Sequence, residues 1–526
     1  MELNRAAGIL MHPTSLPSPD GIGDLGPEAY RWIDFLNRSG CQLWQVLPLG
    51  PTGYGDSPYQ CFSAFAGNPY LISATTLLDQ GLLSKADLAD RPDFPLEKVD
   101  YGPVIKWKLT LLKRSFKHFQ SIQQGTYSGN DPEIIQEYTL FKQNQKGWLE
   151  SFALFMAIKD QQGGVAWNEW PTALRKRQKK SLELFIKEHR DAIDFHTYLQ
   201  FIFYRQWKTL RDYAHKKGIR IIGDIPIFVA YDSADVWENK ALFYLDNDGL
   251  PEVVAGVPPD YFSETGQLWG NPLYKWAAHK EDEYQWWLER LQVVLSQVDI
   301  VRLDHFRGFE AYWEIPFGNK TAVEGRWVEG PGKDFFKVVK ERLGELPIIA
   351  EDLGVITEPV KQMRDTFHLP GMKILQFAFA SDPDDDFLPH NYPVKCVAYT
   401  GTHDNNTTLA WYQAAPEREQ DFCRRYLARS GQDISWSMIR VLWRSTADWV
   451  LAPMQDFLSL GEWARMNYPG TAAGNWSWRM HPDSLSEGLT DRLHETNYLF
   501  ARLPNKEKVA IRKAMLEQTQ GQVMPH

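Results

Sequence analysis

The sequence lacks three features that would point to other classes of protein. Only four of its 526 residues are cysteines and none forms a Cys-X-X-Cys pair, which excludes a disulfide framework. No segment approaches the ~20 apolar residues of a membrane span, and the N-terminal apolar stretch is too short for a signal peptide. Lys and Arg number 57 against 67 Asp and Glu, which argues against a nucleic-acid partner. We expect a cytoplasmic protein that binds neither membrane nor nucleic acid.

Aromatic residues are abundant, with 21 Trp, 22 Tyr and 28 Phe. Indole rings suit flat amphipathic ligands such as sugars, whose C–H faces pack on the ring while their hydroxyls stay wet. The same residues also build aromatic-rich cores, and composition alone leaves both interpretations open.

Short apolar runs recur along the chain, and each ends in polar or glycine-rich residues. They cover residues 8–12, 42–49, 219–229, 298–306, 346–354, 372–379 and 395–404, with a faint eighth at 458–466 or just after. The runs are continuous rather than alternating, which is typical of strands buried on both faces. Amphipathic helical stretches lie between them, at 27–39, 198–217, 283–296 and 333–342. This alternation predicts an α/β fold, a single (β/α)8 TIM barrel over residues 1–526.

Two long segments interrupt the alternation. Residues 73–188 have a helical pattern and predict an inserted, mainly helical subdomain. Residues 231–276 are rich in Gly, Pro and aromatics and poor in helical period, so we expect an inserted, irregular active-site loop region. Irregular loops of this length are uncommon unless they are functional.

Ionisable residues end several of the predicted strands. In a barrel the carboxyl ends of the strands meet at one mouth, where the chemistry gathers. A single Asp at a strand end is often only a helix N-cap, but a cluster of acids suits glycosidic bond cleavage, in which one carboxyl protonates the leaving oxygen and another attacks or activates water. A metal site remains the alternative, although no HxH or HExxH pattern appears. The residues concerned are His12, Asp224, Arg302, Asp304, Glu351, His403 and Asp404.

Three motifs carry a family resemblance. RLDHFRG (302–308), AEDLG (350–354) and THDN (402–405) resemble the catalytic motifs of the 4-α-glucanotransferases, the amylomaltases and disproportionating enzymes related to α-amylases. The likeness runs almost end to end. The first strand motif starts near residue 8, which resembles the short form of the family.

The resemblance implies a role for each of three carboxylates. Asp304 corresponds to the nucleophile that forms a covalent glycosyl-enzyme intermediate, Glu351 to the general acid/base, and Asp404 to the transition-state stabiliser. Arg302 lies two residues before Asp304, on the same face of the strand, where a guanidinium would keep that carboxylate ionised. Burial would have to raise the pKa of Glu351, whereas Asp352 points away and is expected to be structural.

Further residues are expected to bind the sugar chain. Tyr261, Phe262 and Trp269 would stack on glucose units, and Tyr54 and Tyr59 would line the cleft. Ordinary packing stays open for each of these aromatics, and a structural role stays open for the polar residues. The polar candidates are His12, Asp224, Arg302, His403 and Asn475, the last in a GNW motif of unassigned role.

The expected activity is transfer of α-1,4-glucan segments between maltooligosaccharides or to glucose, with retention of configuration. We expect no cofactor and no metal, and we interpret the acidic run 382–386 as a solvated loop. Two other functions remain possible. A retaining α-glucan hydrolase would use the same carboxylates, and a glucan-binding protein on a decayed barrel would not need all three.

Overall fold

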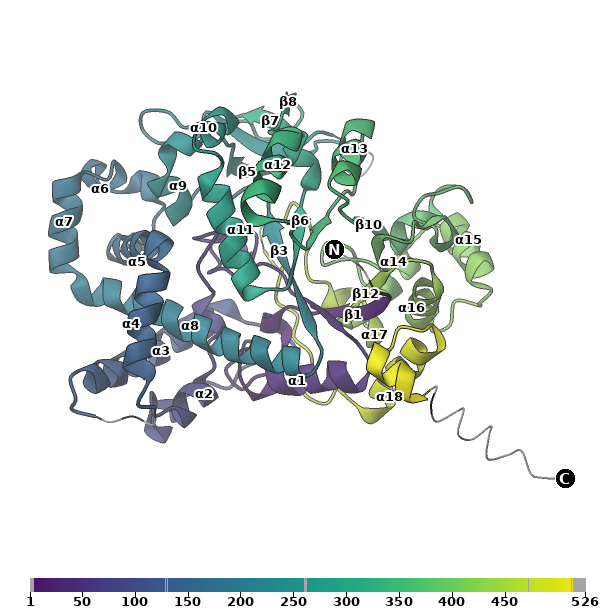
Figure 1. The fold of residues 1–526 in the computed structure, drawn as a ribbon, viewed down its shortest axis with the longest axis horizontal. Coiled ribbons are helices and arrows are strands. Elements are labelled where there is room, and N and C mark those ends of the chain that lie inside the picture. Colours follow the sequence, from purple (N-terminus) through teal and green to yellow (C-terminus); the bar gives the residue numbers. More distant parts are fainter. Residues whose placement is uncertain are drawn as a thin grey trace.

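The computed structural model describes residues 4–511 and 513, except 128, 130, 260–262 and 472. Its centre is an eight-stranded parallel sheet in the order β10-β11-β12-β1-β2-β3-β6-β9, which is the order of the chain starting from β10. Figure 1 shows strands of this sheet in the middle of the molecule, between the helices. The two end strands are joined by a bond from the Ala350 N–H to the Pro370 carbonyl at 2.9 Å, so the sheet nearly closes. The predicted (β/α)8 barrel is confirmed. Its strands are β1 (Ala6–Leu10), β2 (Leu43–Gln45), β3 (Arg220–Pro226), β6 (Ile300–Asp304), β9 (Ile348–Ala350), β10 (Gly371–Ile374), β11 (Cys396–Tyr399) and β12 (Trp449–Pro453).

A separate cluster of buried side chains fills the inside of the barrel and takes a member from every strand. The larger core lies between the strands and the surrounding helices. Strands buried on both faces explain why the apolar runs are continuous in sequence. The inner cluster comprises Ala6, Leu43, Ile222, Ile300, Ile349, Met372, Val397, Tyr399, Trp449 and Leu451.

Seven strands lie within or beside the predicted apolar runs, but the prediction of the eighth is wrong. Residues 458–466 contain no strand, and the eighth strand is β12, Trp449–Pro453. The apolar helix α16 (Ile434–Arg444) ends only five residues earlier, so in sequence the short strand merges with it. The chain beyond β12 folds instead as α17 (Met454–Phe457) and the short helix η10 (Glu462–Ala464).

Helices surround the barrel at the predicted places. Gly40 follows helix α1 (Pro27–Arg38) and Gly218 follows helix α8 (Arg190–Lys216). They take positive φ angles of 73° and 77°, as expected for glycines at helix C-termini. None of the described helices is long and apolar enough to cross a membrane. The surrounding helices include α1 (Pro27–Arg38), α8 (Arg190–Lys216), α10 (Trp276–Glu281), α11 (Gln285–Gln297), α12 (Gly332–Leu343), α13 (Glu358–Thr366), α14 (Thr408–Ala414), α15 (Glu417–Leu427) and α18 (Glu487–Leu499).

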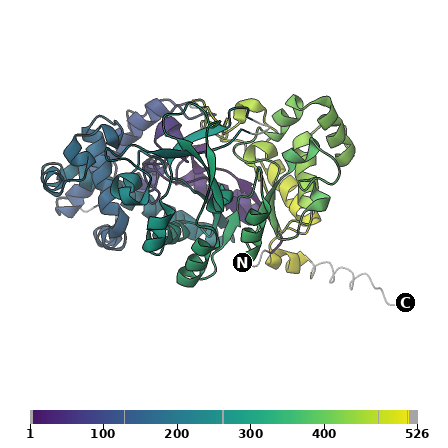
Figure 2. The ribbon, with the colours of Figure 1, turned by 90° about the horizontal axis from the view of Figure 1, so that it is seen from above.

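The segment 73–188 contributes mostly helices, which Figures 1 and 2 place at one end of the molecule, in blue. Aromatic rings join these helices to α8: the Phe119 and Tyr198 centroids are 4.9 Å apart, and those of Trp148 and Tyr204 are 5.7 Å apart. The helices are α2 (Ala74–Asp79), α3 (Tyr101–Gln123), α4 (Ile134–Asn144), α5 (Lys146–Gln161), α6 (Thr172–Arg175) and α7 (Lys179–Glu188).

The segment 231–276 is more regular than predicted. It contains α9 (Ala234–Glu238) and two strands, β4 (Val253–Val257) and β5 (Gln267–Pro272). These pair with β7 (Ala311–Pro316) and β8 (Arg326–Glu329) in an antiparallel sheet of order β5-β4-β7-β8. The expectation of a wholly irregular loop is therefore wrong. The sheet needs strands from beyond the segment, which the local sequence does not reveal.

Candidate active site

The three candidate carboxylates lie at the carboxyl ends of barrel strands. Asp304 is the last residue of β6, Glu351 directly follows β9, and Asp404 lies in the loop after β11. Leu303 pairs with Ala350 across β6 and β9, so Asp304 and Glu351 occupy neighbouring positions. The barrel topology thus brings them to the same mouth, as predicted.

Arg302 bridges two carboxylates on adjacent strands. Its Nη1 lies 2.6 Å from Asp224 Oδ2 and 2.8 Å from Asp304 Oδ1. The Tyr59 hydroxyl donates to the same Asp224 oxygen at 2.7 Å. The side chain of Asp224 is fully buried, whereas that of Asp304 is 28% exposed. Arg302 therefore holds Asp304 in place, while part of the Asp304 side chain stays exposed at the mouth.

The neighbouring carboxyl groups keep the Arg302 guanidinium charged. Burial alone would lower the pKa of Arg302, but Asp224 and Asp304 outweigh it and raise this pKa well above its usual value. Arg302 therefore stays charged, and it donates a charge-assisted hydrogen bond to Asp304.

Glu351 is held by the main chain. Its Oε2 accepts from the His305 N–H at 2.7 Å and its Oε1 from the Leu353 N–H at 3.0 Å. His305 adopts a left-handed conformation, with φ 51°, immediately after Asp304. The backbone that follows one carboxylate thus positions the other.

Burial raises the pKa of Glu351 to about 8, and the charge of Asp304 adds to this rise. The positive charge of Arg302 and the two N–H bonds oppose it without cancelling it. The Glu351 carboxyl therefore keeps its proton at neutral pH and can donate it to a leaving group.

Asp404 is held from the loop that follows β12. Asn467 Nδ2 donates to Asp404 Oδ1 at 2.6 Å, and Arg465 Nη2 donates to the Asp404 main-chain carbonyl at 2.7 Å. His403 Nε2 lies 3.3 Å from the other carboxylate oxygen. The side chain remains 46% exposed, so it is oriented yet open to a ligand.

Aromatic rings surround these groups. Tyr59 stacks on His403 with centroids 5.1 Å apart and planes 17° apart, and Trp476 lies 5.8 Å from each ring. Trp269 on β5 meets the His305 ring edge-on at 4.9 Å. The antiparallel sheet thereby reaches the barrel mouth beside Asp304 and Glu351.

The remaining predicted residues differ in their surroundings: two are bound within the fold, one is exposed, and two lie outside the described residues. His12 Nδ1 accepts from the Leu47 N–H at 3.2 Å, and burial and the nearby His403 lower its pKa to about 3, so it is neutral. Asn475 Oδ1 accepts from the Tyr468 N–H at 2.9 Å, so it shapes its own loop. Tyr54 is 76% exposed. Tyr261 and Phe262 lie outside the described residues.

Asp352 contributes to packing outside the group. Its carboxylate accepts from the Met372 N–H at 2.7 Å and pairs with Arg364 at 2.5 Å. The sequence-based expectation of a structural role is confirmed.

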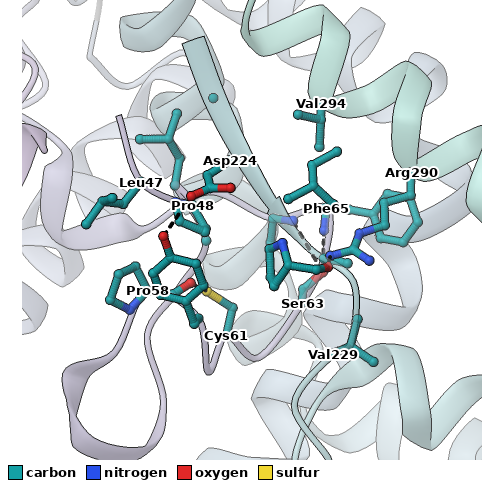
Figure 3. Close-up of a pocket in the computed structure, with 18 of the residues that line it drawn as sticks. Leu47, Pro48, Pro58, Cys61, Ser63, Phe65, Asp224, Val229, Arg290 and Val294 are labelled. Atoms are coloured by element: carbon teal, nitrogen blue, oxygen red, sulfur yellow. Dashed lines mark hydrogen bonds between the residues drawn. The ribbon is translucent and has the colours of Figure 1, made fainter. Parts of the chain in front are cut away.

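A cavity of about 60 Å³ lies behind Asp224, and Figure 3 shows Asp224 and Arg290 on opposite sides of it. Arg290 on α11 donates to the carbonyls of Pro226 at 2.7 Å and Ile227 at 3.2 Å. It thereby fixes the end of β3, the strand that carries Asp224.

Sequence reasoning missed Asn467 and Arg465. Both lie in the loop after β12, and the misplaced eighth strand hid that loop as a part of the mouth. Had Trp449–Pro453 been recognised as the last strand, the polar residues beyond it would have been candidates by their topological position.

The arrangement of the described side chains does not support a metal site. Within the described part of the chain, no group of three or more His, Cys, Asp or Glu side chains is arranged to hold a metal ion. Asp224, the most buried acid of the suggested set, is bound by Arg302 and Tyr59 instead.

Comparison with known proteins identifies the family. Residues 11–486 match the family model described as 4-alpha-glucanotransferase. The chain belongs to the 4-alpha-glucanotransferase family. A 4-alpha-glucanotransferase of Thermus thermophilus is 51% identical over 494 residues, 92% of this chain and 97% of that relative. One from Synechocystis is 47% identical over 95% of this chain and 98% of that relative.

Solved structures agree with this membership. An amylomaltase from Streptococcus agalactiae in complex with acarbose has a TM-score of 0.91 and 40% identity, and the match covers 95% of this chain and all of that one. An amylomaltase from Corynebacterium glutamicum, at 16% identity and a TM-score of 0.76, shares the fold over 94% of this chain and 75% of that one. The expected family and barrel are thus confirmed, and the chain is an enzyme of the glycosyltransferase type.

Proposed function

We propose that this 4-alpha-glucanotransferase moves α-1,4-glucan segments between maltooligosaccharides, or onto glucose, by double displacement with retention. The proposal rests on one observation: two neighbouring carboxyl groups, those of Asp304 and Glu351, lie in different surroundings. Asp304 is held beside Arg302. Its neighbour Glu351 has a pKa of about 8 and so keeps its proton at neutral pH. An aspartate held by an arginine, next to a glutamic acid that keeps its proton, suits a nucleophile paired with a general acid.

In the first step a carboxylate oxygen of Asp304 forms a bond to the anomeric carbon of the donor. The glycosidic C–O bond breaks, and Glu351 gives its proton to the departing oxygen. The oxocarbenium-like transition state carries positive charge, which the nearby carboxylates stabilise. Asp404, fixed by Asn467, is oriented to hold sugar hydroxyls at this point.

In the second step the hydroxyl of an acceptor chain attacks the same carbon. Glu351, now ionised, takes the hydroxyl proton, and the bond to Asp304 breaks. Two inversions at one carbon restore the original configuration. The free enzyme is regenerated with Glu351 protonated.

The same intermediate would be hydrolysed if water attacked it. Transfer requires a site that excludes water and binds the acceptor well. We assign that task to the segment 231–276, because its Trp269 contacts His305 beside the two carboxylates. If shortening this segment left the ratio of transfer to hydrolysis unchanged, the assignment would be wrong.

The decisive experiment incubates the protein with maltotriose and reads the products by mass. Glucose together with maltotetraose, maltopentaose and longer chains is expected. The ladder should vanish in Asp304→Asn and persist in Asp386→Asn, a matched change at an exposed aspartate. Glucose and maltose without longer chains would indicate that the protein is a hydrolase and not a transferase. No turnover at all would indicate a glucan-binding protein.

A further inference from the structure

A row of apolar side chains crosses the antiparallel sheet beside the barrel mouth. Gly256 pairs with both Leu268 and Trp313, and Trp313 pairs with Trp327. Residues directly opposite in antiparallel strands share one face of the sheet. Leu268, Trp313 and Trp327 therefore form one line, here called the tryptophan row, with a gap at the glycine.

The outer end of the tryptophan row is open to solvent. Trp327 on the edge strand β8 is 42% exposed, and Leu268 at the other end is 36% exposed. The hairpin that joins β7 to β8 adds Phe317 and Val323, each 51% exposed. Single exposed apolar residues are ordinary, but several on one edge strand and its hairpin indicate a binding surface.

The row is continuous with the active site through Arg307. The guanidinium carbon of Arg307 lies 3.9 Å from the centroid of the Trp327 ring. The same side chain donates to the carbonyl of Val355, four residues beyond Glu351. Arg307 itself follows His305 by two residues, and the His305 N–H binds Glu351. Trp327 thus lies near the mouth, on the outer side of Arg307, which contacts the segments that follow β6 and β9.

We infer that Trp327 is a stacking surface for glucose units of a long α-1,4-glucan, on the Glu351 side of the mouth. This rests on the proposed function, which supplies the ligand class. The Trp327 side chain is 42% exposed, so it offers an apolar surface for sugar C–H groups, and the Arg307 guanidinium beside it adds hydrogen-bond donors. The leaving group and the acceptor occupy the side on which the acid/base acts. A chain long enough to leave the cleft there meets the tryptophan row.

Chain length is therefore the property that Trp327 controls. A short substrate held within the cleft makes no contact with β8, so its turnover does not depend on this ring. A long chain gains the contact in the ground state and the transition state alike. Uniform binding of this kind lowers KM and leaves kcat unchanged.

The test compares maltotriose with amylose as substrate for Trp327→Ala and Trp327→Phe. We expect Trp327→Ala to raise KM for amylose about tenfold, from lost apolar burial, with kcat and maltotriose turnover unchanged. Trp327→Phe should raise it less. Tyr498→Ala is the matched control, since Tyr498 is 39% exposed on α18 and outside the row. An unchanged amylose KM in Trp327→Ala would overturn the inference, as would an equal rise for maltotriose.

A second measurement does not depend on whether Trp327→Ala folds. Hydroxyl-radical oxidation of Trp327 is read by mass spectrometry in Asp304→Asn protein, with and without amylose. Protection by amylose but not by maltotriose is the expected result, and no protection would contradict the inference. If wild-type protein fails to disproportionate maltotriose yet amylose still protects Trp327, the proposed function has failed and the binding surface has not.

Discussion

The amide of Asn467 donates a 2.6 Å hydrogen bond to the carboxylate of Asp404, across 63 residues of sequence. It joins the loop after the eighth barrel strand to the loop after the seventh. Because the bond uses Oδ1 while His403 faces Oδ2, both oxygens have a fixed direction. Asn467 is thus a positioning residue for a carboxylate that is itself half-exposed.

Asn467→Ala should lower kcat while affecting KM less. A hydrogen bond to a charged group contributes about 1.5–3 kcal/mol, so the expected loss is about 10- to 100-fold in kcat. Steady-state kinetics on maltotriose measures it. Asn144→Ala, at the exposed end of α4, is the control and should behave as wild type. A KM effect without a kcat effect would show that Asn467 serves ground-state binding instead.

Arg302→Met should destabilise the fold as well as abolish activity. It leaves the fully buried Asp224 side chain without its cation, which typically costs about 3–5 kcal/mol. Arg302→Met combined with Asp224→Asn should recover much of that loss and remain inactive, because Asp304 is still unsupported. Thermal unfolding and maltotriose turnover report the two effects. Equal destabilisation of the single and double variants would argue against the buried-charge explanation.

The pH dependence should reveal Glu351. If Glu351 is the general acid, as we propose, its pKa of about 8 means that it loses the proton above that pH, so kcat/KM should fall on the alkaline side with an apparent pKa near 8. Glu351→Gln should remove this limb when the donor carries an activated leaving group that needs no protonation. An alkaline limb that survives in Glu351→Gln would assign the titration to another group.

Stability should respond to the same group. Folded Glu351, with a pKa of about 8 against 4.5 for an ordinary glutamate, binds its proton more tightly than the unfolded chain does. Its contribution is therefore fully present below about pH 4.5 and is lost as pH rises through 8. The stability of Glu351→Gln relative to wild type should therefore rise by about 4 kcal/mol between pH 5 and pH 9. Melting temperatures at the two pH values measure it, with Glu341→Gln on the exposed face of α12 as the control.

The sequence was most informative where burial on both faces imposed a pattern. Continuous apolar runs located seven strands, and the polar residues at their ends identified Asp304, Glu351 and Asp404 as neighbours at one mouth. The pairing of Arg302 with Asp304 also followed from alternation along one strand.

What escaped prediction depends on partners distant in sequence. The bond from Arg302 to Asp224 requires the register of β3 against β6, which no local pattern states. The strands β4 and β5 pair with each other, but their sheet is completed by β7 and β8, which lie about 40 residues or more further along the chain. Asn467 reaches Asp404 only because β12 lies beside β11, and the short strand β12 is hidden behind an apolar helix.

The contact between the His305 N–H and Glu351 belongs to the backbone, so no substitution other than proline removes the donor. The backbone therefore supplies a hydrogen bond that orients Glu351, whereas a replaceable side chain, Arg302, holds Asp304. Under the proposed mechanism, substitutions around the site would therefore weaken the support of Asp304 more readily than that of Glu351. The architecture thereby separates what can be engineered in this enzyme from what cannot.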